Sequence, residues 1–274
     1  MQSTSCSILA CQISVPLTRS RIQREQHVTQ LVHKIEHQLA GQDCDLVVLP
    51  ELSTVEYSRE SFGNLDEMGE TLTGDSVEQF RQLARDCNVS LLFGLPRLDG
   101  QRRYISQVYI DAEGGLSHYD KIHVCQYGAS MEKEYFDRGS KLMVFDLAGF
   151  RFGVMICYDI RIPEQCREMV VGHHVEVILH CGAYFRDESF ASWASFVTTR
   201  AMENQVYFLS LNRAGTDYGA SKFSGPWIDE NTPLIDFHPH KEEFRFFRLD
   251  KAHLHDVRAS YTFLKDRLPE YHAI

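Results

Sequence analysis

The sequence predicts an α/β fold in which strands and helices alternate. Strand-like and helix-like stretches follow one another along almost the whole chain, an order that is typical of α/β proteins. The hydrophobic fraction is 43% of 274 residues, which is enough for a substantial core. No linker, low-complexity segment or repeat interrupts the pattern, so we expect one domain over residues 1–274.

Apolar periodicity assigns the individual elements. Residues 26–40 carry apolar side chains at helical spacing and predict an amphipathic helix, whereas the continuous apolar run at 46–49 predicts a buried strand. By the same reasoning we expect further strands at 7–15, 89–94, 104–111, 142–145, 151–157, 175–180 and 206–212, and further helices at 77–86, 163–171 and 190–204. The acidic stretch at 66–70 predicts a solvated loop.

Charge and cysteine usage exclude several classes of function. A net charge of −10 and a pI near 5.7 argue against nucleic acid as a partner, because such binders usually carry a basic face. Eight cysteines lie apart with no CxxC pair, which is typical of reduced thiols and predicts a cytoplasmic protein. We expect no signal peptide and no membrane association, since no run approaches the roughly 20 apolar residues that cross a bilayer.

Three chemically capable side chains stand at or near the ends of predicted strands. Cys157 directly follows the apolar run 152–156, so its thiol is expected to be held rigidly yet open, as a covalent nucleophile requires. Glu51 follows the buried run 46–49 and Pro50, and Lys121 alternates with apolar neighbours in 118–124. Each has an ordinary alternative, namely a small core cysteine, a loop glutamate and a solvated edge lysine. Side chains at strand ends in an α/β protein are candidates for one crevice.

The arrangement of these residues closely resembles the nitrilase superfamily of carbon-nitrogen hydrolases. The matching stretches span most of the chain: Leu49-Pro50-Glu51 with Tyr57, Tyr119-Asp120-Lys121-Ile122-His123, Glu132 ahead of Tyr135-Phe136, Gly153 to Asp159 with Arg161 and Pro163-Glu164, Arg200-Ala201-Met202-Glu203-Asn204, and the closing 266–271.

This resemblance implies a four-layer αββα sandwich and a catalytic triad of Glu51, Lys121 and Cys157. It also implies a supporting glutamate, which by position is Glu132, with Glu134 as the nearby competitor. We further expect a homodimer or a higher homo-oligomer, and neither a metal nor an organic cofactor. The histidines at 173–174, 238–240 and 253–255 lack zinc-ligand spacing and are expected to be surface or loop residues.

The implied chemistry is hydrolysis of a small linear amide, with water as the second substrate. Glu51 would act as general base, while Lys121 and the backbone N–H of Tyr158 would stabilise the oxyanion before a thioester forms on Cys157. An N-carbamoyl amine or amino acid substrate is the alternative, and a nitrile is less favoured. A non-catalytic binding or scaffold member is the alternative from a different class.

Substrate contacts are expected from aromatic and charged residues around the triad. They are Tyr57, Tyr158, Tyr184, Phe185, Arg186 and Trp193, and Arg186 could pair with a substrate carboxylate. The loops that carry these residues depart from the family pattern, for example at Glu56, where a glycine is common. Because loops determine specificity on a rigid scaffold, substrate identity does not transfer from the resemblance.

Overall fold

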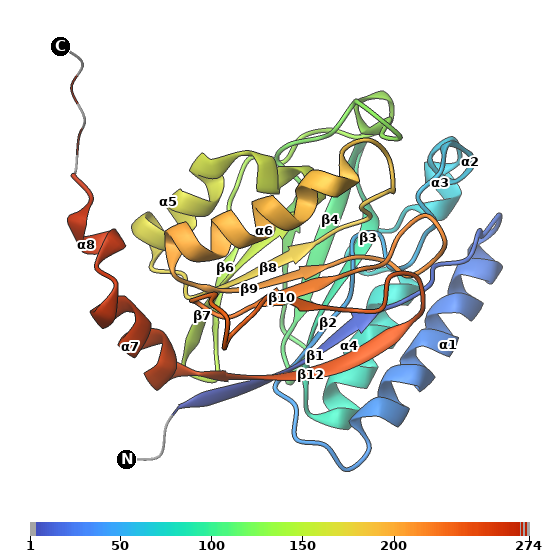
Figure 1. The fold of residues 1–274 in the computed structure, drawn as a ribbon. Helices are drawn as coiled ribbons and strands as arrows, with labels where there is room; N and C mark the ends of the chain where they lie inside the picture. The colour runs from blue at the N-terminus through green and yellow to red at the C-terminus, as the bar shows by residue number, and fades with distance from the viewer. Residues whose placement is uncertain (1–3, 269, 271, 273–274) are drawn as a thin grey trace.

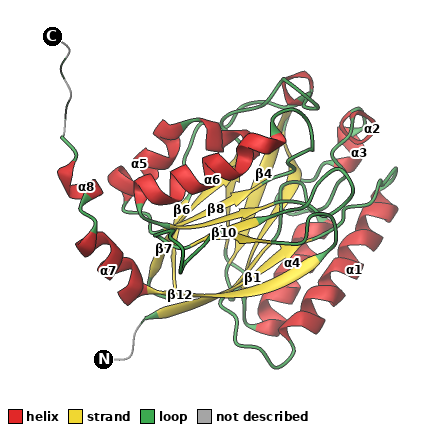
Figure 2. Ribbon diagram, viewed as in Figure 1, coloured by secondary structure: helices red, strands yellow, loops and turns green. Residues whose placement is uncertain are grey.

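Two β-sheets lie face to face between two layers of helices in the computed structural model, which describes residues 4–268, 270 and 272 (Figure 1, Figure 2). This αββα order confirms the predicted fold. Across the first sheet the strands are β12 (Glu243–Asp250), β1 (Ser5–Gln12), β2 (Leu46–Val48), β3 (Ser90–Asp99), β4 (Arg102–Ile110) and β5 (Leu116–Asp120). Across the second they are β11 (Ile235–Asp236), β10 (Lys222–Ser224), β9 (Tyr207–Leu211), β8 (Val177–Cys181), β7 (Phe150–Ile156) and β6 (Val144–Leu147).

Each sheet has a parallel centre and antiparallel edges. In the first sheet β1, β2 and β3 run parallel, and in the second β7, β8 and β9 do so. Parallel strands are buried on both faces, which explains why they are continuous apolar runs in the sequence. Their carboxyl ends point the same way within each sheet, so the polar residues that follow them gather at one edge.

Helices cover both outer faces of the sandwich. On the first sheet α1 (Arg21–Leu39) and α4 (Asp75–Cys87) pack over one apolar cluster, and on the second α5 (Pro163–His173) and α6 (Phe190–Asn204) pack over another. A third cluster fills the space between the sheets. The remaining helices are short or lie near the C-terminus: α2 (Arg59–Phe62), α3 (Leu65–Met68), α7 (Lys251–Ser260) and α8 (Phe263–Asp266). No helix in the described part of the chain is long and apolar enough to span a membrane.

The C-terminal third contains elements that the sequence analysis did not predict. Strand β12 pairs antiparallel with β1 along eight residues, so segments from the two ends of the chain share one sheet edge. Helix α7 begins directly after it, where the Asp250 side chain accepts from the backbone N–H groups of Ala252 and His253. From there α7 and α8 follow one end of the sandwich (Figure 1), and Leu264 of α8 packs against the apolar cluster beneath α5 and α6. Strands β10 and β11 were also not predicted, and Pro269 and Tyr271 of the closing stretch lie outside the described residues.

The prediction of a solvated acidic loop at 66–70 was wrong in two respects, because Leu65–Met68 form helix α3 and the last residue of the stretch is buried. Glu70 is 4% exposed, and its carboxylate lies 3.2 Å from the guanidinium of Arg24, itself buried on α1. A buried carboxylate needs such a partner. The partner is 46 positions away in the sequence, which is why local charge density gave the wrong answer.

Candidate active site

Glu51 lies just past the carboxyl end of β2, fully buried between the two sheets. One carboxylate oxygen accepts from the Lys121 ammonium at 2.8 Å, and the other accepts from the backbone N–H of Ala183, beyond β8 of the opposite sheet, at 2.8 Å. The backbone here is tight, because a Cβ on Gly94 would lie 2.3 Å from the amide nitrogen of Leu52. The glycine therefore permits β3 to approach this turn closely.

Arg213 holds the turn at Glu51 in place through hydrogen bonds to its backbone. Its fully buried guanidinium donates to the backbone carbonyl of Glu51 at 3.1 Å, and also to the carbonyls of Leu52 and Val55. Leu52 adopts a positive φ of 50°, which is uncommon for a residue with a branched side chain and requires support from its surroundings. Arg213 is the first charged residue after the apolar strand β9, separated from it by Asn212 alone. That signal is the same one that identified Glu51, and sequence analysis did not apply it here.

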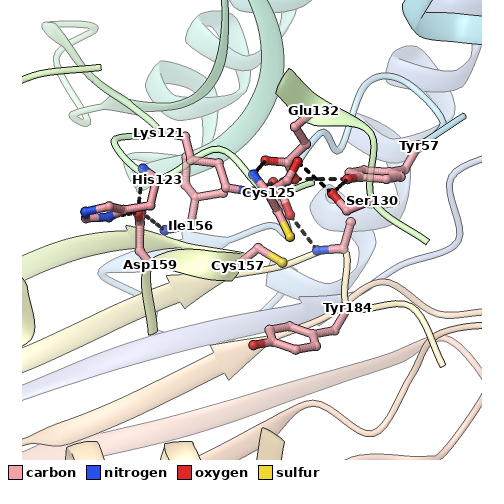
Figure 3. Close-up of polar contacts among 12 residues, drawn as sticks. Tyr57, Lys121, His123, Cys125, Ser130, Glu132, Ile156, Cys157, Asp159 and Tyr184 are labelled. Atoms are coloured by element: carbon pink, nitrogen blue, oxygen red, sulfur yellow. Dashed lines mark hydrogen bonds and ion pairs between the residues drawn. The ribbon is translucent and has the colours of Figure 1, made fainter. Parts of the chain in front are cut away.

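Lys121 follows β5 and stands between two carboxylates. Its ammonium lies 2.7 Å from Glu132 (Figure 3) and 2.8 Å from Glu51. All three side chains are within 1% of complete burial. Burial alone would lower the pKa of Lys121, but the carboxylates of Glu132 and Glu51 outweigh it and raise that pKa well above its ordinary value. The lysine is therefore charged whenever the protein is folded at neutral pH.

Glu132, and not Glu134, faces this lysine. Its Oε1, which accepts from Lys121, also accepts from the Tyr57 hydroxyl at 2.9 Å. Its Oε2 accepts from the backbone N–H of Cys125 at 2.8 Å. Burial raises the pKa of Glu132, although Lys121 acts against this shift. Glu134 is exposed and pairs with Arg59 on α2, so it points away from the site.

Cys157 occupies a sharp turn at the carboxyl end of β7. Its φ of 43° is left-handed, and it opens the 3₁₀ turn η2 (Cys157–Arg161). The buried Asp159 carboxylate holds this turn by accepting from the backbone N–H groups of Ile156 at 2.9 Å and His123 at 3.1 Å (Figure 3). It also accepts from the Tyr119 hydroxyl at 2.6 Å.

The Cys157 thiol is partly open to a cavity but otherwise closely packed. Burial raises the pKa of this thiol well above its ordinary value, and the carboxylate of Glu51 raises it further, while Lys121 opposes both. The resting thiol is therefore protonated, and it requires a base before it can attack a carbon. Glu51 is a carboxylate close enough to act on its ionisation.

The cavity beside Cys157 is small, with a volume of about 40 Å³, and its surface is mainly apolar. It is lined by Tyr57, Cys125, Tyr127, Ala129, Ser130, Glu132, Cys157, Tyr158, Ala183, Tyr184, Phe185, Asp187 and Ser189. Four of the six residues expected to contact substrate are among them, whereas Cys125, Tyr127, Ser130 and Asp187 were missed. These four lie in loops, which have no apolar periodicity from which the orientation of a side chain could be predicted.

Arg186 and Trp193 do not line this cavity. The Arg186 guanidinium donates to the backbone carbonyls of Tyr218 and Pro239, both at 2.8 Å, so it ties three loops together instead of facing a substrate carboxylate. Trp193 is 1% exposed and stacks behind Tyr184 with ring centroids 4.9 Å apart. Within residues 4–268, 270 and 272, no cluster of three or more His, Cys, Asp or Glu side chains has the geometry of a metal site.

Comparison with known proteins identifies the family of this chain. Residues 10–231 match the family described as carbon-nitrogen hydrolase. A probable nitrilase from Schizosaccharomyces pombe is 27% identical over 257 residues, covering 89% of each chain. An (R)-stereoselective amidase from a Pseudomonas species is 28% identical over 228 residues, covering 82% of this chain and 80% of its own.

Solved structures share the fold. A carbon-nitrogen hydrolase superfamily protein from Xanthomonas campestris superposes with a TM-score of 0.82 at 21% identity, over 98% of this chain and 99% of its own. An amidase variant from Nesterenkonia sp. AN1, with the acetamide moiety of fluoroacetamide added covalently to its active-site cysteine, gives a TM-score of 0.75 at 20% identity, over 97% and 95%. The predicted resemblance is confirmed, and this chain belongs to the carbon-nitrogen hydrolase family of enzymes.

Proposed function

We propose that this enzyme is an amidase that hydrolyses small amides through a thioester on Cys157, with Glu51 as general base. The observation that carries the proposal is the buried group of Glu51, Lys121 and Glu132 beside a thiol that opens to the cavity. Its amidase relative, and the cysteine adduct of its structural neighbour, support the same chemistry.

The reaction follows from these positions. Glu51 takes the thiol proton as sulfur attacks the amide carbon, and the Lys121 ammonium with the Tyr158 N–H stabilises the oxyanion. Collapse breaks the C–N bond, and Glu51 returns its proton to the leaving nitrogen, which departs as ammonia or an amine. Glu51 then deprotonates water, whose attack on the thioester releases the acid and restores the thiol.

The cavity lining supports a neutral, apolar acyl group. Tyr57, Tyr127, Tyr158, Tyr184 and Phe185 offer aromatic surface, and the lining residues include no lysine or arginine. A carboxylate on the substrate would have no cationic partner among these side chains, and such an unpaired charge is costly to bury. The enzyme therefore favours uncharged amides over ω-amides of dicarboxylic acids. The homo-oligomer and the cytoplasmic location stay predictions.

Intact-mass spectrometry with a slowly hydrolysed amide tests the nucleophile. The wild-type chain should gain the mass of one acyl group, Cys157→Ala should gain none, and Cys87→Ala, which removes another free and partly exposed thiol, should behave as wild type. An acyl adduct that persists in Cys157→Ala would contradict the assignment.

Ammonia release from a panel of neutral amides, ω-amides, carbamoyl compounds and nitriles tests the substrate class. We expect neutral amides to give the highest kcat/KM. A preference for carbamoyl compounds or nitriles would overturn the amidase proposal, and a lack of release from every compound would argue for a binding or scaffold function.

A further inference from the structure

A chain of buried hydrogen bonds ends on the nucleophile's own carbonyl group. His180 is the fourth of the five residues of β8 and is completely buried. Its Nε2 is 2.8 Å from the carbonyl oxygen of Cys157, and its Nδ1 is 2.7 Å from Oγ of Ser210 on β9. That hydroxyl is in turn 2.9 Å from the indole Nε1 of Trp193 on α6. The parallel register of β8 and β9 pairs His180 with Ser210, which puts both side chains on one face.

The two ends of this chain, together with a neutral imidazole, determine the direction of every bond in it. An indole N–H only donates, and a backbone carbonyl only accepts. Ser210 therefore accepts from Trp193 and donates to Nδ1 of His180, and His180 donates from Nε2 to the Cys157 carbonyl. This arrangement requires a neutral imidazole, and burial lowers the pKa of His180 to about 4.

The acceptor of the last bond matters for the chemistry. The Cys157 carbonyl and the Tyr158 N–H belong to one peptide group, whose resonance couples the oxygen to the nitrogen. A hydrogen bond at the oxygen strengthens the N–H as a donor, because successive hydrogen bonds polarise one another. It also holds the orientation of a peptide that follows a left-handed, non-glycine residue, a conformation that persists only when its surroundings impose it.

We propose that His180 is a positioning residue that orients and polarises the Cys157–Tyr158 peptide, so that the Tyr158 N–H can stabilise the oxyanion. The proposal rests on the proposed function, because it assumes attack by Cys157. It also gives Trp193 a role at the distant end of the chain, in place of the expected contact with substrate. Ser210 fixes the imidazole tautomer that the last bond needs.

The test compares variants that keep or lose the final donor. His180→Met removes the N–H at similar volume, and it should lower kcat by about 10-fold to 100-fold, somewhat less than the loss of a direct oxyanion donor, with KM changed by less than about threefold. His180→Gln retains a side-chain N–H and should recover most of that loss. Ser210→Ala leaves Nδ1 without its donor, and it should lower kcat by about 3-fold to 10-fold.

Two ligands separate this role from a purely structural one. An aldehyde analogue of the substrate forms a tetrahedral oxyanion on Cys157, so its inhibition constant should rise in parallel with the fall in kcat. Iodoacetamide alkylates the thiol without forming an oxyanion, so its rate at Cys157 should stay within about twofold of wild type.

The proposal is overturned if His180→Met keeps wild-type kcat. It is equally overturned if alkylation slows as much as turnover while His180→Gln gives no recovery, because the histidine would then only support the fold. If His180→Met does not fold, wild-type kcat in Ser210→Ala overturns it. An acyl adduct on Cys157 of the wild-type enzyme establishes separately that the proposed function holds.

Discussion

Replacing Lys121 by methionine removes the one cation that Glu51 and Glu132 share. Breaking a buried ion pair by deleting one partner costs about 3–5 kcal/mol, since the remaining charge is left without compensation. Two carboxylates lose their partner here, so the upper part of that range applies. With a urea m-value of about 3 kcal/mol/M, a loss of about 4–5 kcal/mol should lower the unfolding midpoint by about 1.3–1.7 M at pH 8. Turnover should be lost as well.

The loss of stability should depend on pH in a defined direction. Burial raises the pKa of Glu132 and Lys121 lowers it, so the variant has a still higher pKa at this carboxyl in the folded state. A raised folded pKa leaves stability intact below the unfolded value of about 4.3 and reduces it as pH rises through the folded pKa. Urea titrations should therefore show a smaller difference from wild type at pH 5 than at pH 8.

Two further variants make this experiment decisive. Lys133→Met removes an exposed lysine from the same segment and should leave the midpoint unchanged. Adding Glu132→Gln to Lys121→Met removes one of the two carboxylates that lost their cation, so the unfolding midpoint at pH 8 should recover in part. A wild-type midpoint for Lys121→Met at pH 8, or an equal loss at both pH values, would refute this reasoning.

Three other predictions follow from the site. Burial and Glu51 raise the pKa of the Cys157 thiol, so the rate of its alkylation by iodoacetamide should increase about tenfold per pH unit from pH 6 to 8. Peptide mass spectrometry measures this rate, and a rate that does not change with pH would indicate a preformed thiolate. Glu132→Gln should lower kcat by about 100-fold or more, while Glu134→Gln should stay within about twofold, and equal losses would mean that the contacts to Lys121 are unimportant. Arg213→Met, measured by urea unfolding, should lose at least about 3 kcal/mol, because it removes three charged hydrogen bonds to buried carbonyls; a smaller loss would mean that water replaces them.

The reactive residues at the strand ends were predictable because buried strands and reactive side chains differ in polarity. A parallel strand buried on both faces must be apolar, so the first polar residue after it is conspicuous, as Glu51 and Cys157 are. Since parallel strands end at a common edge of a sheet, the proximity of these two residues could be inferred from the sequence alone. The family resemblance then supplied the roles of Lys121 and Glu132, which residue patterns alone left open.

The use of polar side chains within loops could not be predicted in the same way. Arg186 was expected to face the substrate, yet two of its guanidinium nitrogens donate to carbonyls 32 and 53 positions further along the chain. His180 lies inside an apolar strand, where the sequence pattern shows only that one polar residue interrupts the apolar run. Its partners belong to two other elements, and nothing near it in the sequence identifies them.

The geometry of the site depends on both sheets at once. Glu51 comes from the first sheet, yet the groups that hold it, the Ala183 N–H and the Arg213 guanidinium, follow strands of the second. Cys157 belongs to that second sheet, so the distance between the proposed base and nucleophile is set by packing between the sheets and not by any one loop. Close-packed interiors transmit small shifts, and a misplacement of about 1 Å can cost about 100-fold in rate. Substitutions in the core between the sheets should therefore impair turnover before they unfold the protein.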